Sequence, residues 1–220
     1  MPDTKISALT NSTNTPADTD VFVTVESMGT TPGTYRKAWS VLKAAAAAYT
    51  KTLVSSQMLL FGASATIDTT NGATAGSKIE LGTNKQNLNN YPSFGTASKS
   101  YVEWDAMMPG DYGAGAITAE FVWTSPGTAL GTVIWGLQGR AYADGNAIDQ
   151  AWGTAQEISD VNQCSYTENI APASASITLA GAPTAGCSVR FRAYRDGTVA
   201  TNSLGTVALL KLVRVTYTRT

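Results

Sequence analysis

Residues 101–108, YVEWDAMM, and residues 117–123, ITAEFVW, decide the fold class of this chain. In both stretches apolar side chains alternate with polar or charged ones. Val102, Trp104 and Ala106 share one face in the first stretch, and Ile117, Ala119, Phe121 and Trp123 share one face in the second. A period of two residues predicts a β-strand with one buried face. Glu103, Asp105 and Glu120 are then expected on solvated faces.

Further strand-like runs follow at the spacing of an all-β sandwich. They lie at 133–137, with 140–143 continuing that strand or beginning another, and at 163–169, 176–179, 188–194 and 207–218. About eight antiparallel strands in one domain fit a jelly roll better than a seven-stranded immunoglobulin fold, whose Cys-Trp-Cys pattern is missing from this chain. Residues 98–220 are therefore predicted to form a jelly-roll head.

One α-helix is predicted before the strands. Residues 37–57 contain five consecutive alanines and neither Gly nor Pro, which favours a helix. Its apolar side chains recur at spacings of three and four and form one stripe, made of Trp39, Leu42, Ala46, Tyr49 and Leu53. The stripe fits either packing on the chain's own domain or a short parallel bundle with other copies.

The segments around this helix are rich in turn-forming residues. Residues 1–36 hold one compact apolar run, 21–25, which predicts a single strand or a short hairpin. Residues 58–97 are interrupted by Gly, Asn, Thr and Ser, and are expected to be a connector with one or two short strands, for example at 78–81. The expected organisation is therefore a polar segment, a helix, a connector and a mainly β head.

Composition excludes several functions. Only 14% of the 220 residues are charged, and the formal net charge is -1, so no basic surface for nucleic acid is expected. The chain has no histidine, which excludes imidazole acid–base catalysis, Ser-His-Asp hydrolysis and His-ligated zinc. We therefore expect no enzymatic activity and no cofactor.

Membrane insertion and a disulfide framework are not expected either. No stretch approaches the roughly 18–20 apolar residues of a membrane helix, and the N-terminus lacks the apolar core of a signal peptide. The sequence thus predicts a soluble chain that is not secreted. Its two cysteines, Cys164 and Cys187, are expected to be buried free thiols.

The richest candidate site is residues 136–152, GLQGRAYADGNAIDQAW. Planar polar groups and aromatic rings are what proteins use to bind sugars, because amides and carboxylates bond hydroxyls and rings cover the apolar sugar face. The candidate ligand-binding residues are Arg140, Tyr142, Asp144, Asn146, Asp149 and Trp152. The alternative is a long inter-strand loop, with Asp144-Gly145 making the turn and Trp152 anchoring it to the core.

Other polar residues carry weaker signals. The acidic residues near Gly145 match a calcium loop poorly, so no metal is expected. A carboxylate pair for glycoside cleavage would come from Glu103, Asp105, Glu120, Glu157, Asp160 and Glu168, but sequence shows neither their separation nor a raised pKa. Arg190 and Arg192 share the polar face of one strand, where they would pair either with a neighbouring subunit or within one sheet.

Two segments resemble proteins of tailed bacteriophages. Residues 4–42 resemble the N-terminal segment of phage fibre and spike proteins: Ile-Ser-x-Leu, a Thr/Pro/Ala spacer, an Asp before a β run, a Gly/Thr turn, and Arg/Lys before a helix. That segment is thought to attach such proteins to the virion. The matching positions here are Ile6, Leu9, Asp20, Val21, Val23, Val25, Arg36 and Leu42, although the apolar run of the group is usually richer in Leu and Ile.

Residues 135–153 and 189–197 resemble β-sandwich head domains of phage structural proteins. Together the two resemblances imply a homotrimer, assembled in the host cytoplasm, whose N-termini bind other virion proteins and whose heads contact host-surface glycan. Ile6, Leu9, Val21, Val23 and Val25 would then serve attachment. Two other functions stay open: a capsid head fibre or decoration protein, and a carbohydrate-active β-sandwich module.

Overall fold

The computed structural model describes residues 21–25, 34–38 and 56–219, which belong to two units, Met1–Val54 and Ser55–Thr220. In the first unit, β1 (Val21–Val25) pairs antiparallel with β2 (Thr34–Ala38), so that Val23 lies opposite Arg36. The apolar run predicted at 21–25 is therefore one strand of a short hairpin.

The boundaries predicted for the helix are wrong at both ends. Lys37 and Ala38 belong to β2, and Ser56 and Gln57 belong to β3 (Ser56–Phe61). The prediction rested on local helix propensity, which pairing with an apolar strand readily overrides. Residues 39–55, with the predicted stripe of Trp39, Leu42, Ala46, Tyr49 and Leu53, lie outside the described residues, as do Ile6 and Leu9.

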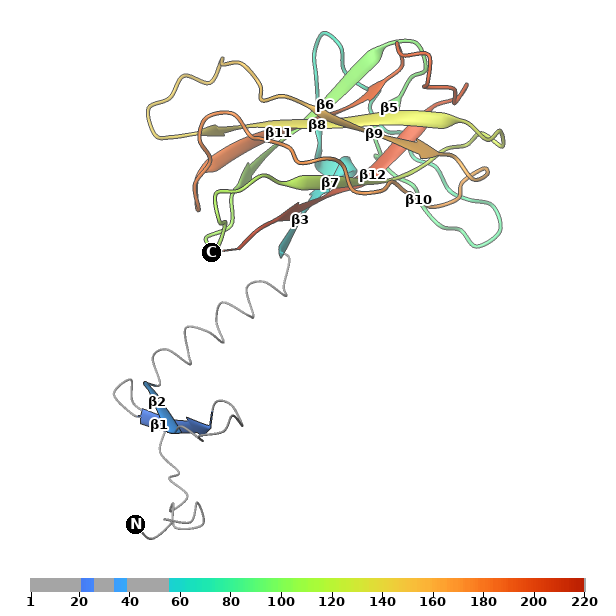
Figure 1. The fold of residues 1–220 in the computed structure, drawn as a ribbon. Coiled ribbons are helices and arrows are strands. Elements are labelled where there is room, and N and C mark those ends of the chain that lie inside the picture. The colour runs from blue at the N-terminus through green and yellow to red at the C-terminus, as the bar shows by residue number, and fades with distance from the viewer. Residues whose placement is uncertain (1–20, 26–33, 39–55, 220) are drawn as a thin grey trace, which may run out of the picture. The chain divides into compact units, whose positions relative to one another are not determined.

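The second unit contains two antiparallel five-stranded sheets (Figure 1). We call the first sheet the β7 sheet. Its strand order is β10-β7-β12-β3, and β5 also pairs with β12. Besides β3, it consists of β5 (Ser93–Phe94), β7 (Thr118–Thr124), β10 (Asn169–Ile170) and β12 (Ala208–Tyr217). The β8 sheet has the order β4-β6-β11-β8-β9, from β4 (Thr66–Ile67), β6 (Lys99–Met107), β8 (Thr132–Tyr142), β9 (Gln156–Val161) and β11 (Ser188–Asp196). A short 3-10 turn, η2 (Gly62–Ser64), follows β3.

The chain crosses between the two sheets in a fixed order. Strands β3, β7, β10 and β12 form one set, and β6, β8, β9 and β11 form the other. Apart from the two-residue strands β4 and β5, the chain runs from β3 in the β7 sheet to β6 in the β8 sheet, back to β7, and then through β8 and β9 of the β8 sheet. It then alternates between the sheets through β10, β11 and β12. This is the strand arrangement of a jelly roll, two Greek keys wrapped into two facing sheets.

The core lies between the two sheets and is made by the predicted alternation. Ile117, Ala119, Phe121 and Trp123 are fully buried, and Val102 and Trp104 face the same core. Trp135 of β8 stacks on Phe121 of β7 with ring centroids 5.4 Å apart, which joins the sheets across the core. The mainly β, antiparallel character predicted from these residues is confirmed.

Other predicted elements differ from the structure. The predicted connector 58–97 supplies β3, β4 and β5, so the compact unit begins at Ser55 and not near Ser98. Residues 78–81 make only one isolated bridge, Glu80 to Asn87, and the runs at 163–169 and 176–179 are mostly loop. The strand β9 was not predicted, because its buried and exposed faces differ too little in polarity.

One inward-facing position of β11 is an arginine. Arg195 is fully buried and has no ion-pair partner among the described residues. Its guanidinium donates to the carbonyl oxygens of Thr206 at 2.7 Å, Leu204 at 2.6 Å and Phe94 at 3.2 Å, and to Asn202 Oδ1 at 3.0 Å. Burial lowers the pKa of Arg195 to about 10. The side chain thereby fastens the loop before β12 and the strand β5 to the β8 sheet.

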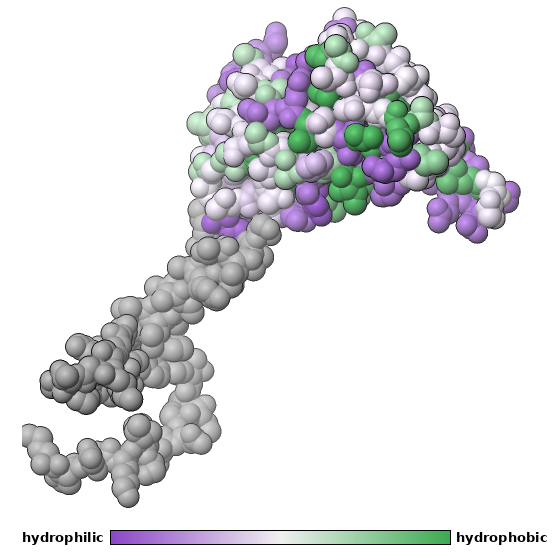
Figure 2. All heavy atoms as spheres, turned by 45° about the vertical axis from the view of Figure 1, so that its right-hand side comes forward, coloured by the Kyte–Doolittle hydropathy of each residue, from purple (hydrophilic) through white to green (hydrophobic). Residues whose placement is uncertain are grey.

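The outer face of the β7 sheet carries a row of apolar side chains. The strand registers place Ile170, Val122, Leu212 and Phe61 side by side across four strands. Ile170 is 58% exposed and Phe61 is 53% exposed, and apolar residues lie among polar ones on the face drawn in Figure 2. The neighbouring charges are paired with each other, Glu120 with Arg214 and Glu168 with Lys211.

The two ends of the second unit meet in this sheet, because Ser56 of β3 lies opposite Tyr217 of β12. Within the described residues, no helix is long and apolar enough to cross a membrane.

Candidate functional site

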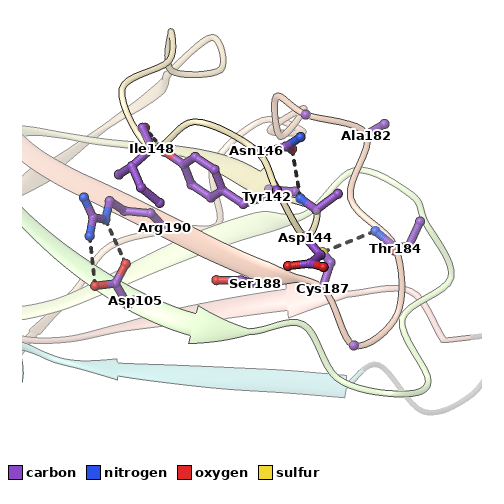
Figure 3. A pocket seen from close by; sticks show the side chains of 15 residues that line it. Asp105, Tyr142, Asp144, Asn146, Ile148, Ala182, Thr184, Cys187, Ser188 and Arg190 are labelled. Carbon is purple, nitrogen blue, oxygen red and sulfur yellow. Dashed lines mark hydrogen bonds and ion pairs between the residues drawn. The ribbon is translucent and has the colours of Figure 1, made fainter.

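A cavity of about 580 Å³ opens on the β8 sheet, where β8 and β11 lead into loops (Figure 3). Its floor comes from the strand ends of β6, β8 and β11, and its walls come from residues 143–148 and 181–187. The side chains that define it include Asp105, Tyr142, Asp144, Asn146, Cys187 and Arg190. We call this cavity the main hollow.

The wall at 143–148 is a tight turn. Gly145 has a φ of +80°, a left-handed conformation that glycine adopts without strain. The backbone N–H of Ala143 donates to Asn146 Oδ1 at 2.9 Å, and the N–H of Asn146 donates to Ala143 O at 3.1 Å. The Asp144-Gly145 turn predicted from the sequence is thus present, and Asn146 closes it while lining the hollow.

The rest of this loop is tied to β8 by side chains. Arg140 donates to Ala151 O at 2.6 Å and to Gln150 Oε1, and Tyr142 Oη donates to Ile148 O at 3.0 Å. Arg140 lines neither cavity of this region, but its guanidinium carbon lies 5.8 Å from the ring centroid of Tyr142, which lines both, and its role in ligand contact stays a prediction. It holds the loop because its guanidinium is engaged with the loop's own acceptors.

Two glycines hold the chain against β8, Gly181 in the opposite wall and Gly153 at the end of the first loop. Gly181 has a φ of +79°, and a Cβ there would collide with the carbonyl oxygen of Ala141. The Ala141 N–H donates to Ala180 O at 2.8 Å. A Cβ at Gly153 would lie 2.8 Å from the carbonyl oxygens of Gly139 and Thr178. These close approaches place the 181–187 loop beside the 143–148 turn.

A second cavity of about 360 Å³, the side hollow, adjoins the main hollow and shares Tyr142, Ile148 and Arg190 with it. It is lined further by Glu103, Asp149, Gln150 and Trp152. The predicted residues Tyr142, Asp144, Asn146, Asp149 and Trp152 therefore all border one of the two hollows.

Trp152 packs against a cation on the sheet surface and not against the core. The guanidinium carbon of Arg192 lies 4.6 Å from the Trp152 ring centroid and 4.3 Å from that of Tyr101. The Gln138 amide oxygen accepts from Arg192 Nε at 2.8 Å and Nη2 at 2.6 Å in the orientation that satisfies both groups. The predicted alternative, in which Trp152 anchors the loop to the core, is wrong. The Trp152 ring stacks on the guanidinium of Arg192, which also lies over the ring of Tyr101.

Arg190 pairs within one sheet. Its Nε and Nη2 donate to the two carboxylate oxygens of Asp105 at 2.8 and 3.1 Å, and its Nη1 lies 4.0 Å from Glu103 Oε2. Of the two pairings predicted for this arginine, the one within a sheet is present. The hydrogen bonds from Arg190 lower the pKa of Asp105, and burial raises the pKa of Glu103.

Two acidic side chains of the hollows have no partner. Asp144 lines the main hollow and Asp149 lines the side hollow, and neither makes a hydrogen bond or ion pair with any described residue. Both are exposed. They are free to accept hydrogen bonds from a ligand.

The remaining predicted carboxylates are engaged elsewhere. Glu157 accepts from Tyr194 Oη at 2.8 Å, and Asp160 accepts from Trp123 Nε1 at 2.7 Å. Glu120 pairs with Arg214, and Glu168 with Lys211. Across residues 56–219, no three His, Cys, Asp or Glu side chains gather where they could hold a metal ion.

Both cysteines are free thiols, as predicted, but they are not buried. Cys164 is exposed, and Cys187 is half-buried at the edge of the main hollow. The Cys187 Sγ accepts a hydrogen bond from the Thr184 N–H at 3.4 Å. Val21, Val23 and Val25, predicted for attachment, lie in β1.

The second wall of the main hollow is not predictable from the sequence. Gly181, Gly186 and Pro183 mark residues 181–187 as a loop. Nothing in the sequence places this loop beside residues 143–148, because that neighbourhood arises from the pairing of β8 with β11.

No protein-family model and no curated protein matches the sequence. Among solved structures, a chain of the "Structure of infectious bursal disease virus Gx strain" is similar over 66% of this chain, at 11% identity and a TM-score of 0.29. The match spans 37% of that chain. A likeness at this TM-score supports no inference about fold or function.

Proposed function

We propose that this chain is a bacteriophage virion structural protein of the fibre or spike type, which adheres to glycan on the host surface through its β-sandwich head. The observation that carries the proposal is the pair of hollows, in which free carboxylates and aromatic side chains face solvent from loops on a rigid sheet. Such loops can bind a ligand without disturbing the sheets beneath them.

Attachment to the virion is the part of the proposal that residues 4–42 support. Their resemblance to phage attachment segments includes the apolar run that forms β1. The jelly-roll strand order also occurs in viral capsid and lectin domains, which is an analogy of fold.

We include a homotrimer in the proposal. The apolar row of Ile170, Val122, Leu212 and Phe61 supports association of copies, because the charged side chains beside it, Glu120 with Arg214 and Glu168 with Lys211, are already paired. Three weak glycan sites on one particle-bound trimer would act together by raising the effective ligand concentration.

Binding to a glycan array tests the adhesive function. The full chain is expected to bind a restricted set of glycans. Asp144→Ala removes an unpartnered carboxylate and is expected to weaken that binding at least about tenfold, because one charge-assisted hydrogen bond to the glycan is lost. Glu80→Gln is the control, since Glu80 forms an exposed ion pair with Lys85 and lines neither hollow. Equal binding by the wild type and Asp144→Ala would place recognition outside the hollows.

Labelled antibody on assembled particles tests the location. Label at the tail tip or fibres agrees with the fibre or spike role. Label spread over the capsid would support the head fibre or decoration protein instead.

A carbohydrate-active module is the second candidate, and one observation favours it. Glu103 and Asp105 lie two residues apart on the outer face of β6, and their pKa values shift in opposite directions, as in an acid and base pair. Against it, Asp105 is held at two points by Arg190 and is therefore a weak nucleophile. Release of reducing sugar that is lost in Glu103→Gln would establish hydrolysis and overturn the purely adhesive function.

A further inference from the structure

The charges around the two hollows point to the kind of glycan that fits them, an inference that rests on the proposed adhesive function. An anionic sugar, such as a sialylated, uronate or sulfated one, needs a cation free to pair with it. Among the described residues, Arg190 is the only basic side chain that lines either hollow. Its fork is filled by Asp105, with Glu103 beside it.

The two nearby arginines are also engaged. Arg192 lies between the rings of Tyr101 and Trp152. Arg140 donates to Ala151 and Gln150. An anion that binds one of these arginines would therefore compete with the acidic or aromatic partners that the arginine already has.

The unengaged charges are negative. Asp144 and Asp149 each lack a partner among the described residues, and they lie on the 143–149 segment that separates the two hollows. An anion in either hollow would meet one of these carboxylates, and the charge of Arg190, which lines both hollows, is already balanced by Asp105. A sugar hydroxyl, in contrast, can donate to either carboxylate in a charge-assisted hydrogen bond.

We propose that the hollows select glycans without anionic groups, whose hydroxyls donate to Asp144 and Asp149. Tyr142 borders both hollows, the main hollow together with Asp144 and the side hollow together with Asp149. It offers an aromatic surface to an apolar sugar face, as rings do in carbohydrate sites.

The test compares matched pairs of glycans on one array, for example N-acetyllactosamine with its sialylated form and a neutral galactan with polygalacturonate. For pairs in which one member binds, the neutral member is expected to bind the full chain at least tenfold more tightly. Its affinity should change little between low and high salt, because no ion pair is formed with the ligand.

A double variant tests whether the two carboxylates cause the selection. Asp144→Asn with Asp149→Asn keeps side-chain size and an acceptor oxygen but removes both charges. In this variant, the affinities for the neutral and the acidic member of a pair are expected to differ by less than threefold. Glu80→Gln, which removes one negative charge outside the hollows, should leave the difference unchanged.

Two failures are distinguishable. Acidic members that bind as tightly as their neutral partners, or a double variant with unchanged selectivity, would overturn the selection while leaving the adhesive function in place. An array on which the full chain binds nothing, with the heads folded, would overturn the adhesive function itself.

Discussion

Arg195 shows how a single residue can hold a sandwich together. Its inward position on β11 would ordinarily carry an apolar side chain, since Val189, Phe191 and Ala193 on the same face are all fully buried. The guanidinium instead donates hydrogen bonds to the buried carbonyl oxygens of Phe94, Leu204 and Thr206. Because buried acceptors without donors are costly, this arginine is structural.

Arg195→Met should therefore lower the free energy of unfolding by about 3 kcal/mol or more, since buried carbonyl oxygens lose their donors. Arg214→Met is the matched control: it removes a half-exposed ion pair with Glu120 and should cost less than about 1 kcal/mol. Urea unfolding measures both. Equal losses in the two variants would contradict the structural role of Arg195.

The neighbouring Asp196 makes stability depend on pH. Burial alone would raise the pKa of its carboxyl, but the hydrogen bonds from Lys99 and Thr198 outweigh burial and hold the pKa below its ordinary value of 3.8. The ionised form therefore stabilises the fold above pH 3.8, and this contribution disappears as pH falls through the lowered pKa. In Asp196→Asn, the urea midpoint should be lower at pH 7 and should fall less steeply between pH 5 and 3 than in the wild type.

At the scale of elements, the alternation of polar and apolar residues predicts long strands that have one apolar and one polar face. It does not reveal strands that are very short or whose two faces are similarly polar. β6, β7, β11 and β12 lie where alternation places them. β4 and β5 have two residues each, too few to show a period, and they form by pairing with β6 and β12. The same holds for the main hollow. The wall at 143–148 is predictable as a polar turn, whereas the position of the wall at 181–187 depends on the pairing of β8 with β11.

The two walls should respond differently to substitution. Gly145 and Gly181 have nearly the same positive φ, +80° and +79°. A Cβ at Gly145 meets no atom, so Gly145→Ala should cost only the left-handed strain, about 1 kcal/mol. Gly181→Ala adds a collision with β8, and it should both lower the melting temperature further and weaken glycan binding. Similar effects of the two substitutions would show that the 181–187 loop does not depend on this contact.

The compact unit needs its first strands. A fragment beginning at Ser98 lacks β3 and β5, and with them the buried Leu60 and Phe94. It should show no cooperative thermal unfolding, whereas a fragment beginning at Ser55 should unfold in one transition. Circular dichroism during heating separates these outcomes, and a cooperative transition in the shorter fragment would mean that β3 and β5 are dispensable.

For the whole molecule, the decisive quantity is the molar mass in solution. The proposed homotrimer predicts three times the 23.0 kDa chain mass by light scattering after size exclusion. Phe61→Lys with Ile170→Lys would place charges in the apolar row and should weaken association of a fragment beginning at Ser55. Lys substitutions at the exposed Thr74 and Thr128 are the control, since neither residue belongs to the row. A full chain that stays monomeric would remove the avidity argument.

The meeting of Ser56 and Tyr217 has a mechanical consequence. A head that grips a surface through the β8 sheet, and is held through the residues before Ser56, receives its load at the start of an edge strand. β3 is bound to its sheet only through β12, over the six residue pairs from Leu212–Phe61 to Tyr217–Ser56. We therefore expect tension to load this ladder first, together with the hydrogen bond from Trp104 Nε1 to Phe61 O, before it reaches the strands that carry the aromatic core.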